Sequence, residues 1–108
     1  MDGLIQVFIT AASQEEGQRI VDALVKRRLA ACGQLLGSIQ STYWWRGRIE
    51  CAGEWLCLVK SQEEKFGDIV RLVEELHSYE VPEVVAVPLV AVSESYGQWL
   101  REELNKAP

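Results

Sequence analysis

The stretch from Gln34 to Lys60 constrains the fold most, because it has the pattern of two long strands joined by a tight turn. Both arms are rich in β-branched and aromatic residues, which favour an extended chain. Arg46-Gly47 supplies the turn, since glycine accepts a positive φ without steric cost, and Gly53 predicts a β-bulge in the second arm. The residues that carry the pattern are Ile39, Thr42, Tyr43, Trp44 and Trp45, then Ile49, Trp55, Leu56, Cys57, Leu58 and Val59. A long β-hairpin is therefore expected.

The segments on either side of this hairpin alternate between strand and helix patterns. A strand is expected over residues 4 to 11. Ser13 and Glu16 then have the spacing of a capping box, and the apolar residues after them favour a helix that runs to about Leu29. Ser61 and Glu64 repeat that spacing after the hairpin and predict the start of a second helix.

The last part of the chain has the pattern of an apolar strand from Val84 to Val92 and a third helix whose apolar residues align from Tyr96 to Leu104. Pro88 inside this strand predicts an edge position or a bulge, because proline has no N–H for the ladder. The order is then βαββαβ with a terminal helix. This is the split βαβ, ferredoxin-like plan of the α+β class.

Length, charge and cysteine content narrow the class of protein. The 108 residues suit a single domain, expected to span residues 1–108. A formal net charge of −5 with no clustered basic face argues against nucleic-acid binding. The sequence has neither a signal-peptide pattern nor an apolar run long enough to span a membrane. Its three widely spaced cysteines are typical of reduced thiols, so a cytoplasmic location is expected.

The strands are apolar on both sides, which bears on assembly. In a ferredoxin-like plan the helices cover one face of an antiparallel sheet, so the strands should alternate apolar and polar residues. Here Tyr43 and Trp45 point to one side and Trp44 to the other, and Leu56 and Leu58 oppose their apolar neighbours. A bare face of this kind would be a larger apolar patch than soluble monomers usually expose. We therefore expect a homo-oligomer.

Five short motifs occur in order along the chain: Leu29–Cys32, Ser41–Glu50, Lys60-Ser61, Leu76–Glu83, and Tyr96 with Trp99-Leu100. Together they resemble the LAAC, S-x-Y-x-W-x-G-K-I-E, K-[TS], H-P-Y-E-x-P-E and Y-x-x-W-L signatures of the CutA family, the divalent-cation tolerance proteins. The resemblance covers nearly the whole chain without obvious insertions. The chain is identified as a member of that family on the joint occurrence of these motifs.

The resemblance implies a homotrimer with a role in tolerance of, or response to, divalent cations, copper above all, through weak metal binding. It also implies an architectural relation to the PII signalling trimers, so the alternative is a sensor or scaffold that binds a small ligand or a partner protein in clefts between subunits. No catalytic activity is implied. The residues agree, because the chain has one histidine and none of the P-loop, G-x-S-x-G or H-E-x-x-H motifs.

His77 and Cys32 are the candidate metal ligands, because imidazole and thiolate suit copper. The alternative for His77 is a structural role at the end of the second helix, where its ring could bond the last carbonyls. The alternative for Cys32 is packing as a small hydrophobe. Some copper-associated members of the family carry ligands at positions that match Ile9 and Leu76, and this chain lacks them. Copper or another divalent metal is therefore a candidate cofactor, but its expected set of ligands is incomplete in this chain.

Five further residues are candidates for a cleft between subunits, by analogy with trimers of this type. They are Lys60, Glu50, Tyr79, Glu83 and Trp99. The aromatic run Tyr43-Trp44-Trp45 has two interpretations. It packs in an interface between subunits, or it forms a surface on which a ligand stacks.

Overall fold

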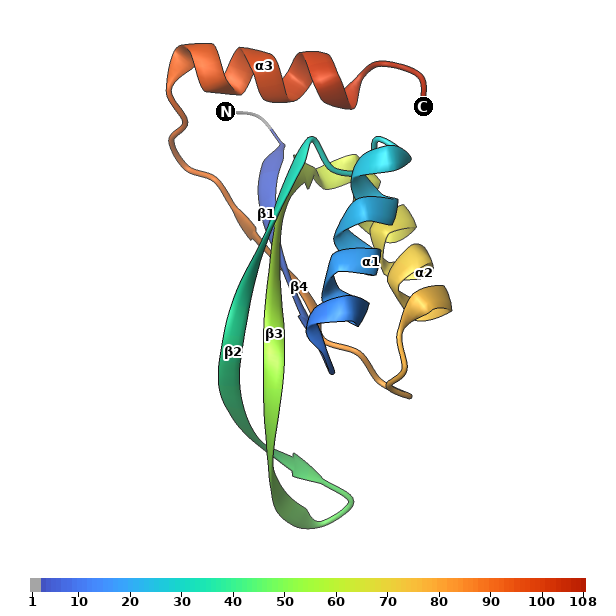
Figure 1. The fold of residues 1–108 in the computed structure, drawn as a ribbon. Helices are drawn as coiled ribbons and strands as arrows, with labels where there is room; N and C mark the ends of the chain where they lie inside the picture. The colour runs from blue at the N-terminus through green and yellow to red at the C-terminus, as the bar shows by residue number, and fades with distance from the viewer. Residues whose placement is uncertain (1–2) are drawn as a thin grey trace.

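The computed structural model describes residues 3–108, and its elements follow the predicted order βαββαβα (Figure 1). They are β1 (Leu4–Ala11), α1 (Gln14–Lys26), β2 (Cys32–Trp45), β3 (Arg48–Gln62), the short 3₁₀ helix η1 (Glu63–Lys65), α2 (Phe66–Leu76), β4 (Val84–Pro88) and α3 (Glu94–Leu104). The predicted α+β class and ferredoxin-like order are confirmed.

The four strands form one antiparallel sheet in the order β2-β3-β1-β4. The central strand β1 pairs on both sides, with Val7 opposite Val59 in β3 and Ala86 in β4. The β2–β3 hairpin extends well beyond the helix layer, as Figure 1 shows. Pro88 ends β4, which lies at an edge of the sheet, so its predicted edge position is confirmed.

The hairpin turn is where the sequence predicted it, but the bulge is not. Arg46 and Gly47 have φ values of 51° and 80°, which is the left-handed backbone of a tight turn. The expected bulge at Gly53 is wrong, because Gly53 pairs regularly with Gln40 and the register shift lies between Gly37 and Ile39 in β2. A Cβ on Gly37 would clash with the indole of Trp55. The register shift therefore follows Gly37, which lies beneath the large side chain of Trp55 on the neighbouring strand.

Two helix boundaries differ from the prediction. Helix α1 ends at Lys26 rather than Leu29, because Arg28 adopts a left-handed φ of 59° and the Leu29 N–H turns back to the Leu24 carbonyl. The predicted cap of the second helix at Ser61 is also wrong. Ser61 still belongs to β3, where its hydroxyl donates to the Leu29 carbonyl oxygen at 2.5 Å. Pairing with β1 extends β3 through Gln62, so α2 begins only at Phe66.

The last strand is shorter than predicted, and only some of the aligned apolar residues of the last helix are buried. Strand β4 stops at Pro88 rather than Val92. Within α3, Leu100 is buried, whereas Tyr96 and Trp99 remain 38% and 40% exposed. Leu100 and Leu104 pack with Leu4 in a small cluster at one end of the sheet.

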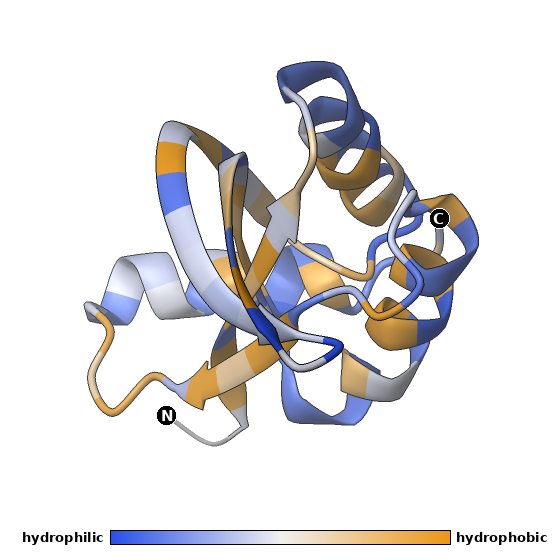
Figure 2. Ribbon diagram, turned by 90° about the horizontal axis from the view of Figure 1, so that it is seen from below, coloured by the Kyte–Doolittle hydropathy of each residue, from blue (hydrophilic) through white to orange (hydrophobic). Residues whose placement is uncertain are grey.

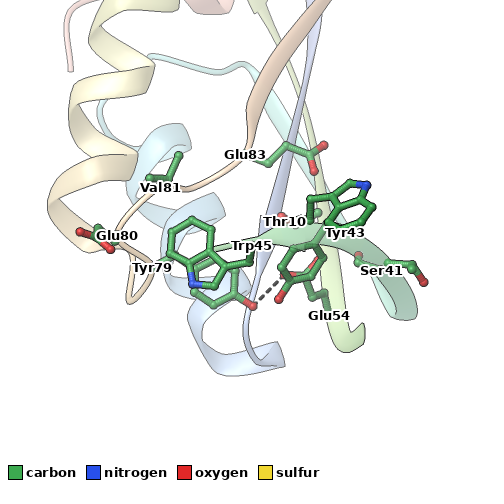
Figure 3. A pocket seen from close by; sticks show the side chains of 11 residues that line it. Thr10, Ser41, Tyr43, Trp45, Glu54, Tyr79, Glu80, Val81 and Glu83 are labelled. Carbon is green, nitrogen blue, oxygen red and sulfur yellow. Dashed lines mark hydrogen bonds between the residues drawn. The ribbon is translucent and has the colours of Figure 1, made fainter. Parts of the chain in front are cut away.

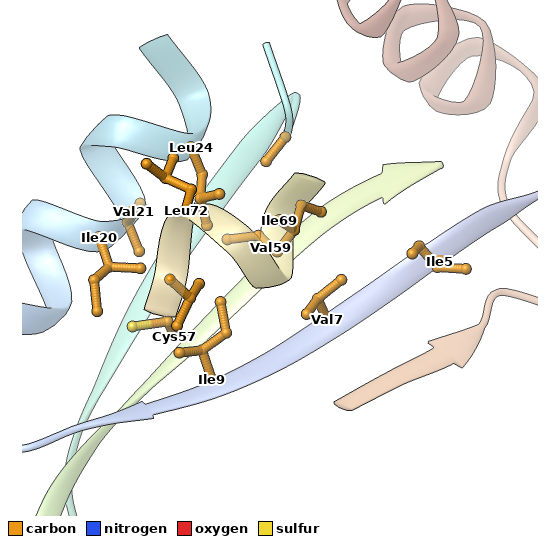
Figure 4. Packing of buried hydrophobic residues seen from close by; sticks show 12 residues of the cluster. Ile5, Val7, Ile9, Ile20, Val21, Leu24, Cys57, Val59, Ile69 and Leu72 are labelled. Atoms are coloured by element: carbon orange, nitrogen blue, oxygen red, sulfur yellow. The ribbon is translucent and has the colours of Figure 1, made fainter. Parts of the chain in front are cut away.

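The main core lies between the sheet and the layer formed by α1 and α2 (Figure 4). Gly33 sets the distance between α1 and the sheet, because a Cβ at that position would lie 2.5 Å from Val21 Cγ1. The core residues shown include Ile5, Val7, Ile9, Ile20, Val21, Leu24, Cys57, Val59, Ile69 and Leu72.

The opposite face of the sheet is apolar and uncovered. The strand register places Phe8 and Leu58 side by side on this face, and both are only partly buried. Leu36 and Val85 are 55% and 49% exposed there. Figure 2 shows further hydrophobic stretches along the strands and along the chain that joins β4 to α3. The apolar residues predicted on both sides of the strands therefore form an exposed apolar surface on this face. None of the helices in the described part of the chain is long and apolar enough to cross a bilayer.

Candidate functional site

A pocket of about 590 Å³ lies where the far part of the β2–β3 hairpin faces the loop after α2 (Figure 3). Two kinds of side chain dominate its wall. The aromatic ones are Tyr43, Trp44, Trp45 and Tyr79, and the carboxylates are Glu54, Glu80 and Glu83. The remaining residues are Thr10, Ser41, Thr42 and Val81. The wall therefore combines ring faces with negative charge.

Tyr79 and Glu54 join the loop to the hairpin inside this pocket. The Tyr79 hydroxyl donates to Glu54 Oε2 at 2.7 Å, and Figure 3 shows it directed toward the hairpin. Burial and this bond both raise the pKa of Tyr79, so its phenol keeps the proton it donates. Glu54 is an acidic residue, yet it is only 4% exposed. Outside the pocket, Arg46 Nη2 lies 3.1 Å from Glu80 Oε1 and makes a second, exposed link.

His77 positions the loop and uses both ring nitrogens to do so. Nδ1 accepts a hydrogen bond from the Tyr79 backbone N–H at 3.0 Å, so it carries no proton. Nε2 then donates to the Thr10 carbonyl oxygen at 2.6 Å. The expected bond to the last helix carbonyls is wrong, because α2 ends at Leu76 and the ring reaches across to β1 instead. The side chain is fully buried.

Glu16 holds the same loop from the other side. Its Oε1 accepts from the Ala12 N–H and its Oε2 from the Ser78 N–H, each at 2.8 Å. Ser13 Oγ accepts from the Glu16 N–H at 3.1 Å, so the predicted cap by Ser13 is confirmed. Glu16 reaches back to Ala12 rather than to Ser13. Burial alone would raise the pKa of Glu16, but hydrogen bonds with Ala12 and Ser78, aided by the neighbouring His77, outweigh it and the pKa is lowered.

The structure does not bring Cys32 and His77 together within one chain. Cys32 pairs with Lys60, whereas Thr10, which His77 contacts, pairs with Leu56. Four residues of β3 separate these positions, or about 13 Å. Cys32 Sγ lies 3.2 Å from the Tyr96 hydroxyl instead. Across residues 3–108, no group of three His, Cys, Asp or Glu side chains is arranged to hold a metal ion.

The five cleft candidates separate into two groups. Tyr79 and Glu83 line the pocket, and Glu50 lies opposite Tyr43 in the hairpin without lining it. Lys60 and Trp99 lie toward the other end of the sheet. There Trp99 lines a smaller cavity of about 340 Å³ beside Arg28, which pairs with Glu103 at 2.7 Å.

Sequence reasoning missed Glu54, Thr10 and the true partners of Glu16. A carboxylate next to the apolar run Trp55–Val59 was the available signal for Glu54, since a charge in such a place is rarely buried without a reason. Thr10 acts through its backbone carbonyl, which no side-chain pattern reveals. The aromatic residues at the hairpin end were recognised as either an interface or a ligand surface, and the structure places them in the pocket wall.

Residues 5–103 match the family described as CutA1 divalent ion tolerance protein. The chain is 38% identical over 99 residues to the divalent-cation tolerance protein CutA of Archaeoglobus fulgidus, which covers 92% of this chain and 96% of the relative. It is 41% identical over 96 residues to that of Thermus thermophilus, covering 89% and 93%. Plant relatives are longer, since the match to the chloroplastic rice protein CutA 1 spans 95% of this chain and 58% of the relative at 31% identity.

Solved structures of the same kind have the same fold. A structure described as the periplasmic divalent cation tolerance protein CutA from Archaeoglobus fulgidus superposes with a TM-score of 0.91 at 35% identity, covering 94% of this chain and 99% of that one. The Thermus thermophilus protein superposes with a TM-score of 0.90 at 39% identity, covering 93% and 97%.

Proposed function

The chain belongs to the CutA1 divalent ion tolerance family, and we propose that it works there as a trimeric binding protein, a sensor or scaffold, and not as an enzyme. The observation that carries this proposal is the pocket between the hairpin and the loop after α2. The groups in and next to it are suited to binding. The raised pKa of Tyr79 keeps the phenol in the pocket wall protonated, and both nitrogens of His77, which lies behind the wall, are engaged in hydrogen bonds. A concave, aromatic wall with a few polar groups is the usual form of a small-molecule site.

Association with two further copies is proposed on the uncovered apolar face of the sheet. Leu36 and Val85 are 55% and 49% exposed on this face, and another copy of the chain would cover them. The number three comes from the family resemblance. Sedimentation analysis at micromolar concentration tests the assembly, and a monomer there would contradict it.

A direct role in metal binding is the second candidate, because the family is described by tolerance of divalent ions. Since Cys32 and His77 lie apart in one chain, copper would need ligands from more than one subunit. Titration of copper into the wild type and into a Cys32→Ser, His77→Ala double variant tests this. Saturable binding that the double variant loses supports it, and unchanged binding removes these two residues as ligands.

A cytoplasmic location is proposed on the three free thiols, Cys32, Cys51 and Cys57. The Archaeoglobus protein with the same fold is described as periplasmic. Cell fractionation decides between the two compartments, and recovery in a periplasmic fraction would contradict the proposal.

A thermal-shift screen with nucleotides, carboxylates, amines and metal salts tests the pocket, since a ligand that binds only the folded protein raises its Tm. Val81→Trp adds bulk at the pocket wall and should change the response to any hit. Val90→Trp is the matched control, because Val90 is 91% exposed and does not line the pocket. Equal responses from both variants would place the site elsewhere, and a screen without any hit would contradict the proposal.

A further inference from the structure

We propose that the pocket takes a small organic cation of the ammonium class, held between aromatic ring faces and carboxylates. This inference rests on the proposed binding function and names its ligand class. The charge of the pocket wall favours a cation. The wall carries three carboxylates, from Glu54, Glu80 and Glu83, and no lysine, arginine or histidine. Arg46 already pairs with Glu80 at 3.1 Å, so Glu54 and Glu83 are the carboxylates left to repel anions and attract cations.

One of these carboxylates, that of Glu54, is buried and not on the surface. Only 4% of the Glu54 surface is exposed to solvent. Its hydrogen-bond partner, the Tyr79 hydroxyl, is a neutral group. Within residues 3–108 no basic side chain forms an ion pair with Glu54 or Glu83. A buried carboxylate without a positive partner is costly. A cation in the pocket would supply the partner that the chain lacks.

The aromatic residues make an organic cation a better fit than a metal ion. Tyr43, Trp44 and Trp45 remain 40%, 71% and 38% exposed around the pocket, although large rings are normally buried. Ring faces attract ammonium and guanidinium groups through their quadrupole. The structure already contains one such contact, because the Arg46 guanidinium carbon lies 5.2 Å from the centre of the Trp45 ring. A bare metal ion would instead need a close cluster of ligands, which residues 3–108 do not form.

The size of the pocket and a hydroxyl group in its wall indicate what else the ligand carries. A volume of about 590 Å³ accommodates a small molecule with room for a polar tail. Ser41 and Thr42 both lie in the wall. Ser41 offers a hydroxyl group to that tail, whereas the Thr42 hydroxyl lies 3.4 Å from Cys51 Sγ. The ligand is therefore an amine or a quaternary ammonium compound that carries a hydroxyl or similar group.

Calorimetric titration with choline tests the inference. The control ligand is its uncharged isostere, in which a tert-butyl group replaces the trimethylammonium group and the shape is kept. Choline should bind saturably, and the isostere should bind at least about tenfold more weakly, because it lacks the attraction to the rings and carboxylates. Equal binding of both would overturn the cation class and leave the small-ligand function intact. If neither binds at millimolar concentration, the inference fails, and the wider thermal-shift screen decides separately whether the pocket binds anything.

Variants locate the site. Tyr43→Leu should weaken choline binding by at least about fivefold, whereas Tyr43→Phe keeps the ring and should bind like the wild type. Tyr96→Leu is the matched control, because Tyr96 is 38% exposed against 40% for Tyr43 and does not line the pocket. Glu54→Gln should weaken choline and not its isostere. Loss of binding in Tyr96→Leu, or none in Tyr43→Leu, would overturn the assignment to this pocket.

Discussion

Glu16→Ala tests how the pocket loop is held in place. Glu16 is 5% exposed and accepts from the backbone N–H groups of Ala12 and Ser78 at 2.8 Å each. Removing the carboxylate leaves both donors without their acceptor, at about 1–3 kcal/mol for each fully buried group. Ala12 and Ser78 are exposed residues, so water can reach part of each site and the lower half of that range applies. With two such donors, the free energy of unfolding should therefore fall by about 2–4 kcal/mol.

Guanidinium unfolding followed by tryptophan fluorescence measures this loss at one fixed protein concentration, because the stability of an oligomer depends on concentration. Glu15→Ala is the control. It removes a carboxylate from the same first turn of α1 but from an exposed position, so it should cost less than about 1 kcal/mol. Equal losses in the two variants would refute the claim that Glu16 holds the loop.

The Glu16 carboxylate also makes the stability difference between the wild type and Glu16→Ala depend on pH. The pKa of Glu16 is lowered in the folded protein from its ordinary value of 4.5. A group with a depressed folded pKa contributes stability that is fully present above its unfolded pKa and is lost as the pH falls through the folded pKa. The gap between wild type and Glu16→Ala should therefore be constant near neutral pH and shrink below about pH 4.5. A gap that widens with acidification would contradict this assignment.

Three other predictions concern packing, assembly and thiol chemistry. Gly33→Ala should lower the free energy of unfolding in urea by about 1–3 kcal/mol, because its Cβ would meet Val21 Cγ1 at 2.5 Å. Gly53→Ala is the control, because its Cβ would have no neighbour within 4 Å, and its effect should be within about 0.5 kcal/mol of zero. Similar losses in the two variants would refute the close approach of α1 to the sheet. Leu36→Glu should shift the sedimenting species toward monomer, and an unchanged assembly would place the interface elsewhere. Cys57 should be the slowest thiol to alkylate, because burial raises its pKa to about 11, and mass spectrometry that finds it labelled before the exposed Cys51 would contradict its place in the core.

Features that depend on neighbours in sequence were predicted well. The turn at Arg46-Gly47, strand β1 and the cap by Ser13 follow from local backbone preferences and local hydrogen bonds, and the structure contains all three. The element order followed from periodicity, and with it the ferredoxin-like arrangement.

Features that depend on tertiary contacts were predicted poorly. Ser61 has the spacing of a helix cap, but pairing with β1 keeps it in a strand. His77 looked like a helix-end residue or a metal ligand, yet its bonds go to Thr10 and Tyr79. The pocket itself joins the hairpin to a loop 25 residues or more further along, as in the bond between Glu54 and Tyr79, and no local pattern encodes that contact.

A crystal structure of the protein soaked with choline and copper together tests whether the pocket is the ligand site, because both candidate sites are offered a ligand in one experiment. The trimethylammonium group should lie against the rings of Tyr43 and Trp45, on the Glu54 side of the pocket. An empty pocket, with copper held by Cys32 and His77 from different chains, would contradict it.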